Sequence, residues 1–211
     1  MNEIICADCL EVLKSMPDKS VDIVLTDPPY GIKLGYDIYN DTQENLRELI
    51  RRTLPEMLRV GKVVVLTPGV INVGLYPGYK WMLAWVNTAG AGSGPWGFTC
   101  WQPILVWGTD PFLAGGKGRR PDIIQDNSRS GEFGHPCSKP LSLMKQIIER
   151  VSLCESDTIL DPFCGSGTTC VAAKILGRKY IGIEISPVYA EIARKRVEQA
   201  QYEERLFQEA A

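Results

Sequence analysis

Residues 157–186, DTILDPFCGSGTTCVAAKILGRKYIGIEIS, constrain the possible folds of this chain more than any other segment. A short apolar run is followed by a glycine-rich turn, a helical stretch, a second apolar run and an acid, which predicts a strand–turn–helix–strand unit. Gly165 and Gly167 let the backbone turn sharply and let a ligand approach it closely. The segment therefore predicts two strands of a sheet and a ligand at the turn.

The rest of the chain repeats this alternation of strands and helices. We expect a short strand at residues 3–8, buried strands at residues 21–27 and 61–69, and helices at residues 9–16, 43–59, 140–153 and 187–207. Asp8 is placed to cap the first of these helices, and Pro55 is expected to kink or split the second.

The middle of the chain, from about residue 70 to 135, is rich in Gly, Pro and Trp. We expect strands near 80–86 and 102–108, which puts Trp81, Trp85 and Trp107 in the core, and long loops at 89–98 and 108–122. With these strands included, the pattern indicates an α/β fold with a mostly parallel, doubly wound sheet of about seven strands.

Bulk properties limit the class of protein. The 211 residues fit one domain, and no apolar run approaches the roughly 20 residues that span a bilayer. Seven cysteines, an odd number, indicate free buried thiols in a reducing compartment, so we expect a cytoplasmic protein. Cys6 and Cys9 form a C-x-x-C pair without a second pair, and His135 is the only histidine, so we expect no metal site.

The glycine turn and its acids indicate the ligand. Glu184 ends the second strand of the unit, where an acid can bind the hydroxyls of a ribose. A P-loop is excluded because no Gly-Lys-Ser/Thr follows the turn, and Cys170 replaces the third glycine of a dinucleotide fingerprint. Asp161 would repel a pyrophosphate. S-adenosylmethionine, with ribose, adenine and cationic groups but no phosphate, fits better; an ordinary strand–helix–strand unit remains the alternative.

A second motif, Asp27-Pro28-Pro29-Tyr30, follows the strand expected at 21–27. In an open α/β sheet, ligands lie outside the carboxyl ends of strands, where the strand order reverses. If the strands that end at Asp27 and Asp161 are neighbours across that point, the two motifs face one crevice.

Together these motifs resemble the amino-directed DNA methyltransferases, which methylate adenine N6 or cytosine N4. The resemblance rests on DPPY at 27–30, DPFCGSGTT at 161–169 and GIEIS at 182–186, with ICADCLEVLKSMPDKSVDIVLTDPPYG at 5–31 and HPCSKPLSLMKQII at 135–148. The catalytic motif comes first, as in the permuted β group of that family. The resemblance covers about residues 1–69 and 135–200 and implies one methyltransferase domain, residues 1–211, with a target-recognition insert within about 70–134.

The resemblance also implies catalytic roles for the DPPY motif. The Asp27 carboxylate and the Pro28 carbonyl would each accept one hydrogen of the target amine. Pro29 has no N–H to divert this geometry, and Tyr30 would stack on a flipped-out base. Catalysis would then be positioning and electrostatic support for in-line methyl transfer.

By the same resemblance, S-adenosylmethionine would be bound along the strand ends. Glu184 would hold the ribose, Asp8 and Cys9 would approach the adenine, and Lys139 and Ser138 would reach the methionine carboxylate. The methionine portion would lie against the glycine loop, which comprises Asp161, Phe163, Gly165, Ser166 and Gly167. Simpler roles remain open: Asp8 as a helix cap, Lys139 as a surface lysine, and His135 as a residue that only orders its loop.

The expected partner is DNA. A net charge of −2 argues against strong nonspecific binding, so contacts are expected from local groups: Lys117, Arg119, Arg120 and Trp96. The small insert favours a short recognition site, a homodimer, or both.

The base and the reaction have alternatives. DPPY favours adenine N6 over cytosine N4, and Asp in the first position favours DNA over RNA or a protein amide. Pro136-Cys137 is similar to the nucleophile of cytosine-C5 enzymes, but the activating glutamate of those enzymes is missing. A subunit that binds DNA or cofactor without turnover is the alternative to an enzyme.

Overall fold

The computed structural model describes residues 2–90, 92–94, 96–129 and 138–202. Its main sheet has eight strands in the order β1-β10-β9-β2-β3-β7-β4-β8. Their bounds are β1 (Glu3–Cys6), β2 (Val21–Thr26), β3 (Gly61–Leu66), β4 (Trp81–Val86), β7 (Trp101–Trp107), β8 (Ile123–Gln125), β9 (Thr158–Asp161) and β10 (Lys179–Glu184). Every pairing is parallel except those of β7 with β3 and β4. The mostly parallel sheet is confirmed.

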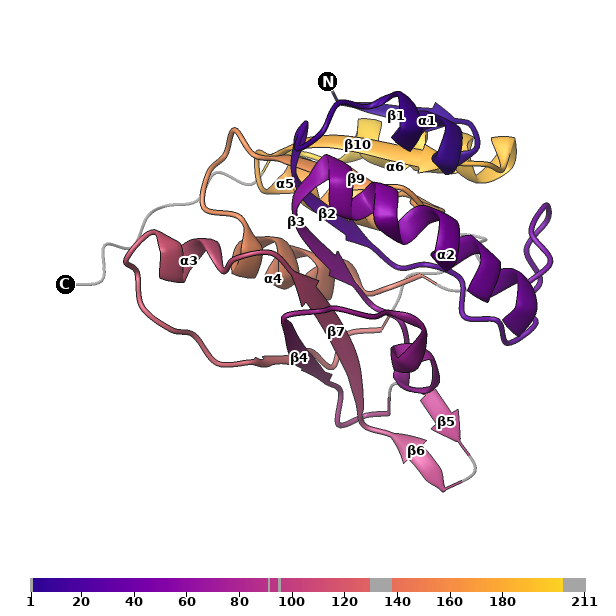
Figure 1. Cartoon of the computed structure of the whole chain (residues 1–211), viewed down its shortest axis with the longest axis horizontal. Coiled ribbons are helices and arrows are strands. Elements are labelled where there is room, and N and C mark those ends of the chain that lie inside the picture. The colour runs from indigo at the N-terminus through magenta and orange to yellow at the C-terminus, as the bar shows by residue number, and fades with distance from the viewer. Residues whose placement is uncertain (1, 91, 95, 130–137, 203–211) are drawn as a thin grey trace.

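Helices cover both faces of the sheet (Figure 1). On one face lie α1 (Cys9–Ser15) and α2 (Gln43–Val60), and on the other α4 (Leu141–Val151), α5 (Thr168–Ile175) and α6 (Pro187–Gln199). Successive residues of β2 point to opposite faces: Ile23 and Leu25 belong to the core under α4 to α6, and Val24 to the core under α1 and α2. The doubly wound arrangement follows from strands that are apolar on both sides.

Two helices differ from expectation. Helix α2 is not split at Pro55, because its apolar face, with Ile50, Leu54 and Met57, packs on the sheet and outweighs the one hydrogen bond that proline removes. Helix α6 ends at Gln199, short of the predicted residue 207, and residues 203–211 lie outside the described part of the chain.

The middle of the chain contains more structure than its sequence predicts. The predicted loop 89–98 holds a hairpin of β5 (Gly92–Gly94) and β6 (Gly97–Thr99), and the loop 108–122 holds the short helix α3 (Pro111–Ala114). A 3-10 helix, η1 (Val70–Leu75), precedes β4. With β8 at its end, the main sheet has eight strands, where about seven were expected. These elements are too short to show a periodic pattern.

The tryptophans and cysteines test the predicted core. Trp85 and Trp107 are buried as expected, but Trp81 is 60% exposed. Trp81 shares a sheet face with Trp85 but begins its strand, where it borders an open cavity instead of a helix. The six described cysteines are free thiols, and half of them, Cys6, Cys100 and Cys154, are exposed, so the prediction that they are buried was only partly right. Within the described residues no helix is long and apolar enough to cross a membrane.

The strands that carry the two motifs are neighbours, which is the condition under which both motifs face one crevice. Strand β2 pairs with β9 in parallel, with Ile23 opposite Ile159 and Val24 opposite Leu160. Beside β9 the sheet continues with β10 and then β1, and beside β2 it continues with β3. The chain therefore passes from β9 to β10 in one direction and from β2 to β3 in the opposite direction. Asp27 and Asp161 therefore lie at the carboxyl ends of two neighbouring strands, at the switch point of the sheet; this side of the sheet, where the parallel strands end, is called the carboxyl edge.

Candidate active site

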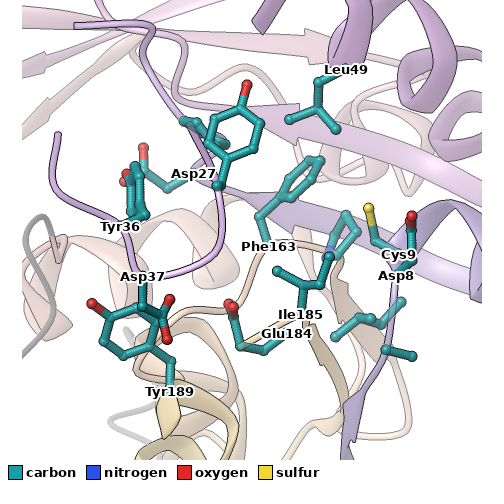
Figure 2. Close-up of a pocket in the computed structure, with 15 residues that line it drawn as sticks. Asp8, Cys9, Asp27, Tyr36, Asp37, Leu49, Phe163, Glu184, Ile185 and Tyr189 are labelled. Carbon is teal, nitrogen blue, oxygen red and sulfur yellow. The ribbon is translucent and has the colours of Figure 1, made fainter. Parts of the chain in front are cut away.

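A cavity of about 230 Å³ lies at the carboxyl ends of the parallel strands. Acids from three strand ends line it: Asp8 after β1, Asp27 after β2 and Glu184 at the end of β10. Figure 2 shows Phe163 between Asp27 and the side formed by Asp8 and Cys9, with Glu184 below. Of the predicted site residues, the structure brings together six here, namely Asp8, Cys9, Asp27, Pro29, Phe163 and Glu184.

A small second cavity of about 30 Å³ adjoins it through Asp27 and Phe163, which line both. It gathers the other predicted cofactor residues except Gly167: Ser138, Lys139, Asp161, Gly165 and Ser166. The hydroxyl oxygens of Ser138 and Ser166 are 3.1 Å apart, which joins the segment before α4 to the glycine turn. Residues separated by more than a hundred positions thus meet at one site.

Asp161 lies beneath the glycine turn and is 3% exposed. Its carboxylate accepts hydrogen bonds from the Thr26 hydroxyl at 2.5 Å and from the Phe163 backbone N–H at 3.1 Å. Burial raises the pKa of Asp161 to about 6, against these hydrogen bonds. The side chain therefore fastens the turn to β2.

Glu184 fastens the same turn to β10. One carboxylate oxygen accepts a hydrogen bond from the Gly165 N–H at 2.8 Å, and the other accepts one from the Ser186 N–H at 2.9 Å. Burial raises the pKa of Glu184, and the neighbouring Asp37 raises it further. Each oxygen keeps a lone pair with which it can accept a ligand hydroxyl.

Gly167 is required by packing as well as by its backbone. It has a φ of +83°, and a Cβ placed on it would lie 2.8 Å from the Cβ of Ala193 in α6. The glycine lets α5 start directly against α6. Asp8, at the opposite side of the cavity, accepts a hydrogen bond from the Leu10 N–H at 2.8 Å and so caps α1 while facing the cavity.

Three donors hold Asp27. Its Oδ1 accepts hydrogen bonds from the Thr67 hydroxyl at 2.5 Å, from the Tyr30 hydroxyl, and from the Lys139 ammonium at 2.8 Å. Its Oδ2 accepts only from Lys139, at 2.9 Å, among the contacts of the described residues. The Lys139 side chain is 6% exposed and that of Asp27 16% exposed. Lys139, expected at the methionine carboxylate or on the surface, is thus buried in an ion pair with Asp27.

The remaining DPPY residues are oriented by neighbouring segments. The Tyr30 carbonyl accepts hydrogen bonds from the side-chain amides of Asn72 and Gln43. The Tyr30 hydroxyl donates to Asp27. Because Tyr30 is only 8% exposed, little of its ring is open for stacking. Pro28 is buried, whereas Pro29 lines the cavity.

Sequence reasoning missed the loop of residues 31–42, which borders the cavity with Tyr36, Asp37 and Tyr39. Asp41 folds this loop by accepting hydrogen bonds from three backbone N–H groups, and the Ser186 hydroxyl donates to Asp37 at 2.5 Å. The cluster GYDIYND at residues 35–41, three residues after DPPYG, was the available signal.

The cavity is acidic and aromatic. Its lining includes the carboxylates of Asp8, Asp27, Asp37 and Glu184 and the rings of Tyr36, Tyr39, Phe163 and Tyr189, and it has no lysine or arginine among the residues described. Carboxylates attract cations and accept hydrogen bonds from hydroxyls, and aromatic faces attract cations and planar rings. The site favours a cationic, hydroxylated, aromatic ligand and disfavours phosphates.

The residues expected to contact DNA lie outside these two cavities. Arg119 and Arg120 line a different cavity, near Val63 at the amino end of β3. Arg120 donates hydrogen bonds to the carbonyls of Glu149 and Arg150. Lys117 and Trp96 are exposed. His135, Pro136 and Cys137 lie outside the described residues, within which no group of three metal-ligating side chains occurs.

Comparisons with known proteins agree with this geometry. The family model for N6/N4 methyltransferases, described as DNA methylase, matches residues 84–195. The chain is 32% identical over 212 residues to "Putative methylase YubD" of Escherichia coli (strain K12), covering 93% of this chain and 90% of that protein. It is 27% identical over 237 residues to the type II methyltransferase M.HpaI of Haemophilus parainfluenzae, covering 92% and 74% respectively.

A solved structure shows the same fold. The crystal structure of the M1.HpyAVI–SAM complex has a TM-score of 0.66 and 26% sequence identity, over 92% of this chain and 98% of that chain. The strand-end acids, the glycine turn and the relatives in sequence and structure lead to one assignment. The chain belongs to the N6/N4 DNA methylase family.

Proposed function

We propose that the protein transfers a methyl group from S-adenosylmethionine to the exocyclic N6 amine of adenine in DNA. The observation that carries this proposal is the acidic, aromatic cavity that runs from Glu184 to Asp27. It joins a site suited to a cationic nucleoside to a motif suited to an amine. A type II methyltransferase among the relatives and a SAM complex among the similar structures support it.

The chain offers a complementary group for each part of the cofactor. Glu184 and Asp37 would accept hydrogen bonds from the ribose hydroxyls, and the adenine would lie by Phe163, Asp8 and Cys9. The methionine portion would extend toward Gly165 and Ser166 in the adjoining cavity. When bound, S-adenosylmethionine supplies an electrophilic methyl group.

Asp27 and Pro28 would act on the target amine. The lone pair of an exocyclic amine is delocalised into the ring, so the amine is a poor nucleophile. Hydrogen bonds from the amine to the Asp27 carboxylate and the Pro28 carbonyl would draw the nitrogen toward tetrahedral geometry and direct its lone pair at the methyl group. Oδ2 of Asp27 is the oxygen for this task, because Oδ1 already has three donors.

The finer assignment concerns the base and the group. DPPY, with Asp in the first position, and its place ahead of the glycine turn favour an adenine-N6 enzyme of the permuted β group. The matched family includes both N6 and N4 methylation, so N4-methylcytosine is the second candidate product.

Labelled methyl transfer to unmethylated DNA tests the proposal, with the DNA hydrolysed and its nucleosides identified by mass spectrometry. We expect N6-methyldeoxyadenosine; N4-methyldeoxycytidine would establish the second candidate, and no transfer to any DNA would contradict both. Asp27→Ala should lower the transfer rate by about 100-fold or more while S-adenosylmethionine binding persists. Asp18→Ala, which removes an acid with a 76% exposed side chain, is the control and should change neither.

A further inference from the structure

The β5–β6 hairpin exposes two large aromatic side chains. Trp96, between the strands, is fully exposed, and Phe98 in β6 is 85% exposed. Gly92, Gly94 and Gly97 have no side chains, so the hairpin is slender. In Figure 1 it projects from the body of the molecule. Exposed aromatic groups on a projecting element mark an interaction site, because packing within the domain does not account for them.

The strand pairings place this hairpin at the edge of the sheet where the parallel strands end and where the candidate active site lies. Strand β7 is antiparallel to β3 and to β4, so the end of β4 and the start of β7 lie at the same edge as the end of β3. Leu105 pairs with Leu66 at the end of β3, and Trp101 lies four residues farther, about 13 Å beyond that edge. The hairpin ends at Thr99, two residues before β7 begins, so it lies beyond the same edge of the sheet as Asp27, with β3 between the strand that precedes Asp27 and β7.

A DNA duplex bound at this edge would meet the hairpin. Asp27 can reach an exocyclic amine only if the base leaves the stack, which costs the stacking and pairing energy of that base. Proteins that distort DNA in this way insert apolar wedges between base steps. An indole matches the width of a base, and every base offers a face for stacking.

We propose that Trp96 inserts into the duplex beside the target base and occupies the gap that the flipped base leaves. The inference rests on the proposed DNA methylation and names the residue that opens the duplex. Trp96 is a positioning residue: it acts on the DNA stack and does not touch the reacting amine. Its contribution should therefore depend on whether the target base is already unpaired and so costs less to extrude.

The test compares methylation of two duplexes that differ at one position. In the first the target base is paired; in the second it faces an abasic site and is already unpaired. Trp96→Ala should lower the rate on the paired duplex about 5- to 150-fold, the range for loss of one aromatic–base stack, and the rate on the second duplex less than about 3-fold. Trp96→Phe should retain most of the activity on both.

Trp81→Ala is the matched control. It removes another exposed tryptophan, at the opposite end of the same sheet, and should leave both rates unchanged. A Trp96→Ala variant as active as wild type on the paired duplex would overturn the inference, and so would an equal loss on both duplexes, which would indicate a simple affinity contact. If the wild-type protein methylated neither duplex, the proposed function itself would fail, and the inference with it.

Discussion

Replacing Lys139 with methionine tests how the structure holds the carboxylate of Asp27. The ammonium lies 2.8 and 2.9 Å from the two carboxylate oxygens. Methionine keeps the length and apolar stem of lysine but removes the charge, so Asp27 would retain only the hydroxyls of Thr67 and Tyr30.

The expected loss follows from burial. Removing one partner of a fully buried ion pair costs about 3–5 kcal/mol, because the other charge is left uncompensated. Asp27 is 16% exposed and keeps two hydroxyl donors, so we expect the free energy of unfolding to fall by about 2–3 kcal/mol. Asp27→Asn in the Lys139→Met background removes the leftover charge and should recover most of this loss.

Urea denaturation of the single and double variants forms a double-mutant cycle, in which we expect a coupling energy of about 2 kcal/mol. Lys62→Met is the matched control, because the Lys62–Asp22 pair has a similar distance, 2.7 Å, but side chains that are 59% and 29% exposed. It should cost less than about 1 kcal/mol. Additive losses across the cycle would show that the buried pair does not support Asp27.

Cofactor affinity separates the two roles for Lys139. If Lys139 holds Asp27, Lys139→Met and Asp27→Asn should both lower the methylation rate and leave the Kd for S-adenosylmethionine within about 3-fold. A Kd that rises at least about tenfold in Lys139→Met but not in Asp27→Asn would instead place Lys139 at the methionine carboxylate, as the family resemblance implied.

Two further predictions concern the glycine turn. Burial raises the pKa of Asp161 to about 6, so protonation of Asp161 between about pH 7 and 5 should remove negative charge and weaken binding of the cationic cofactor; calorimetry should show a Kd that rises as the pH falls. Burial also raises the pKa of Glu184, so Glu184→Gln should flatten the acidic part of this profile. Gly167→Ala should lower the free energy of unfolding by about 3 kcal/mol, because left-handed backbone strain adds to the contact with Ala193. The control Gly116→Ala, with φ +70° and no neighbour within 4 Å, should cost about 1 kcal/mol. Equal melting temperatures of the two variants would refute the close approach of Gly167 to Ala193.

The parts of the fold that were predictable are those specified by local pattern. Apolar runs marked β2, β3 and β9, and Gly165 and Gly167 marked the turn before α5, because glycine alone enters such backbone conformations freely. The β5–β6 hairpin and β8 were not predicted, because three-residue strands have no measurable periodicity. The exposure of Trp81 depends on whether a helix covers it, and neighbouring residues in the sequence do not encode that.

The candidate site divides in the same way. By itself, the sequence determined which chemical groups are present, and it placed them at the carboxyl ends of strands. The acids, the glycine turn and the DPPY motif could therefore be assigned to the side of the sheet where the parallel strands end. Only the tertiary structure decided the partners: Lys139 pairs with Asp27 across 112 positions, and Asp161 turns inward to Thr26 across 135. Such choices depend on the burial and distance of each charge relative to all the others, and these quantities exist only once the chain is packed.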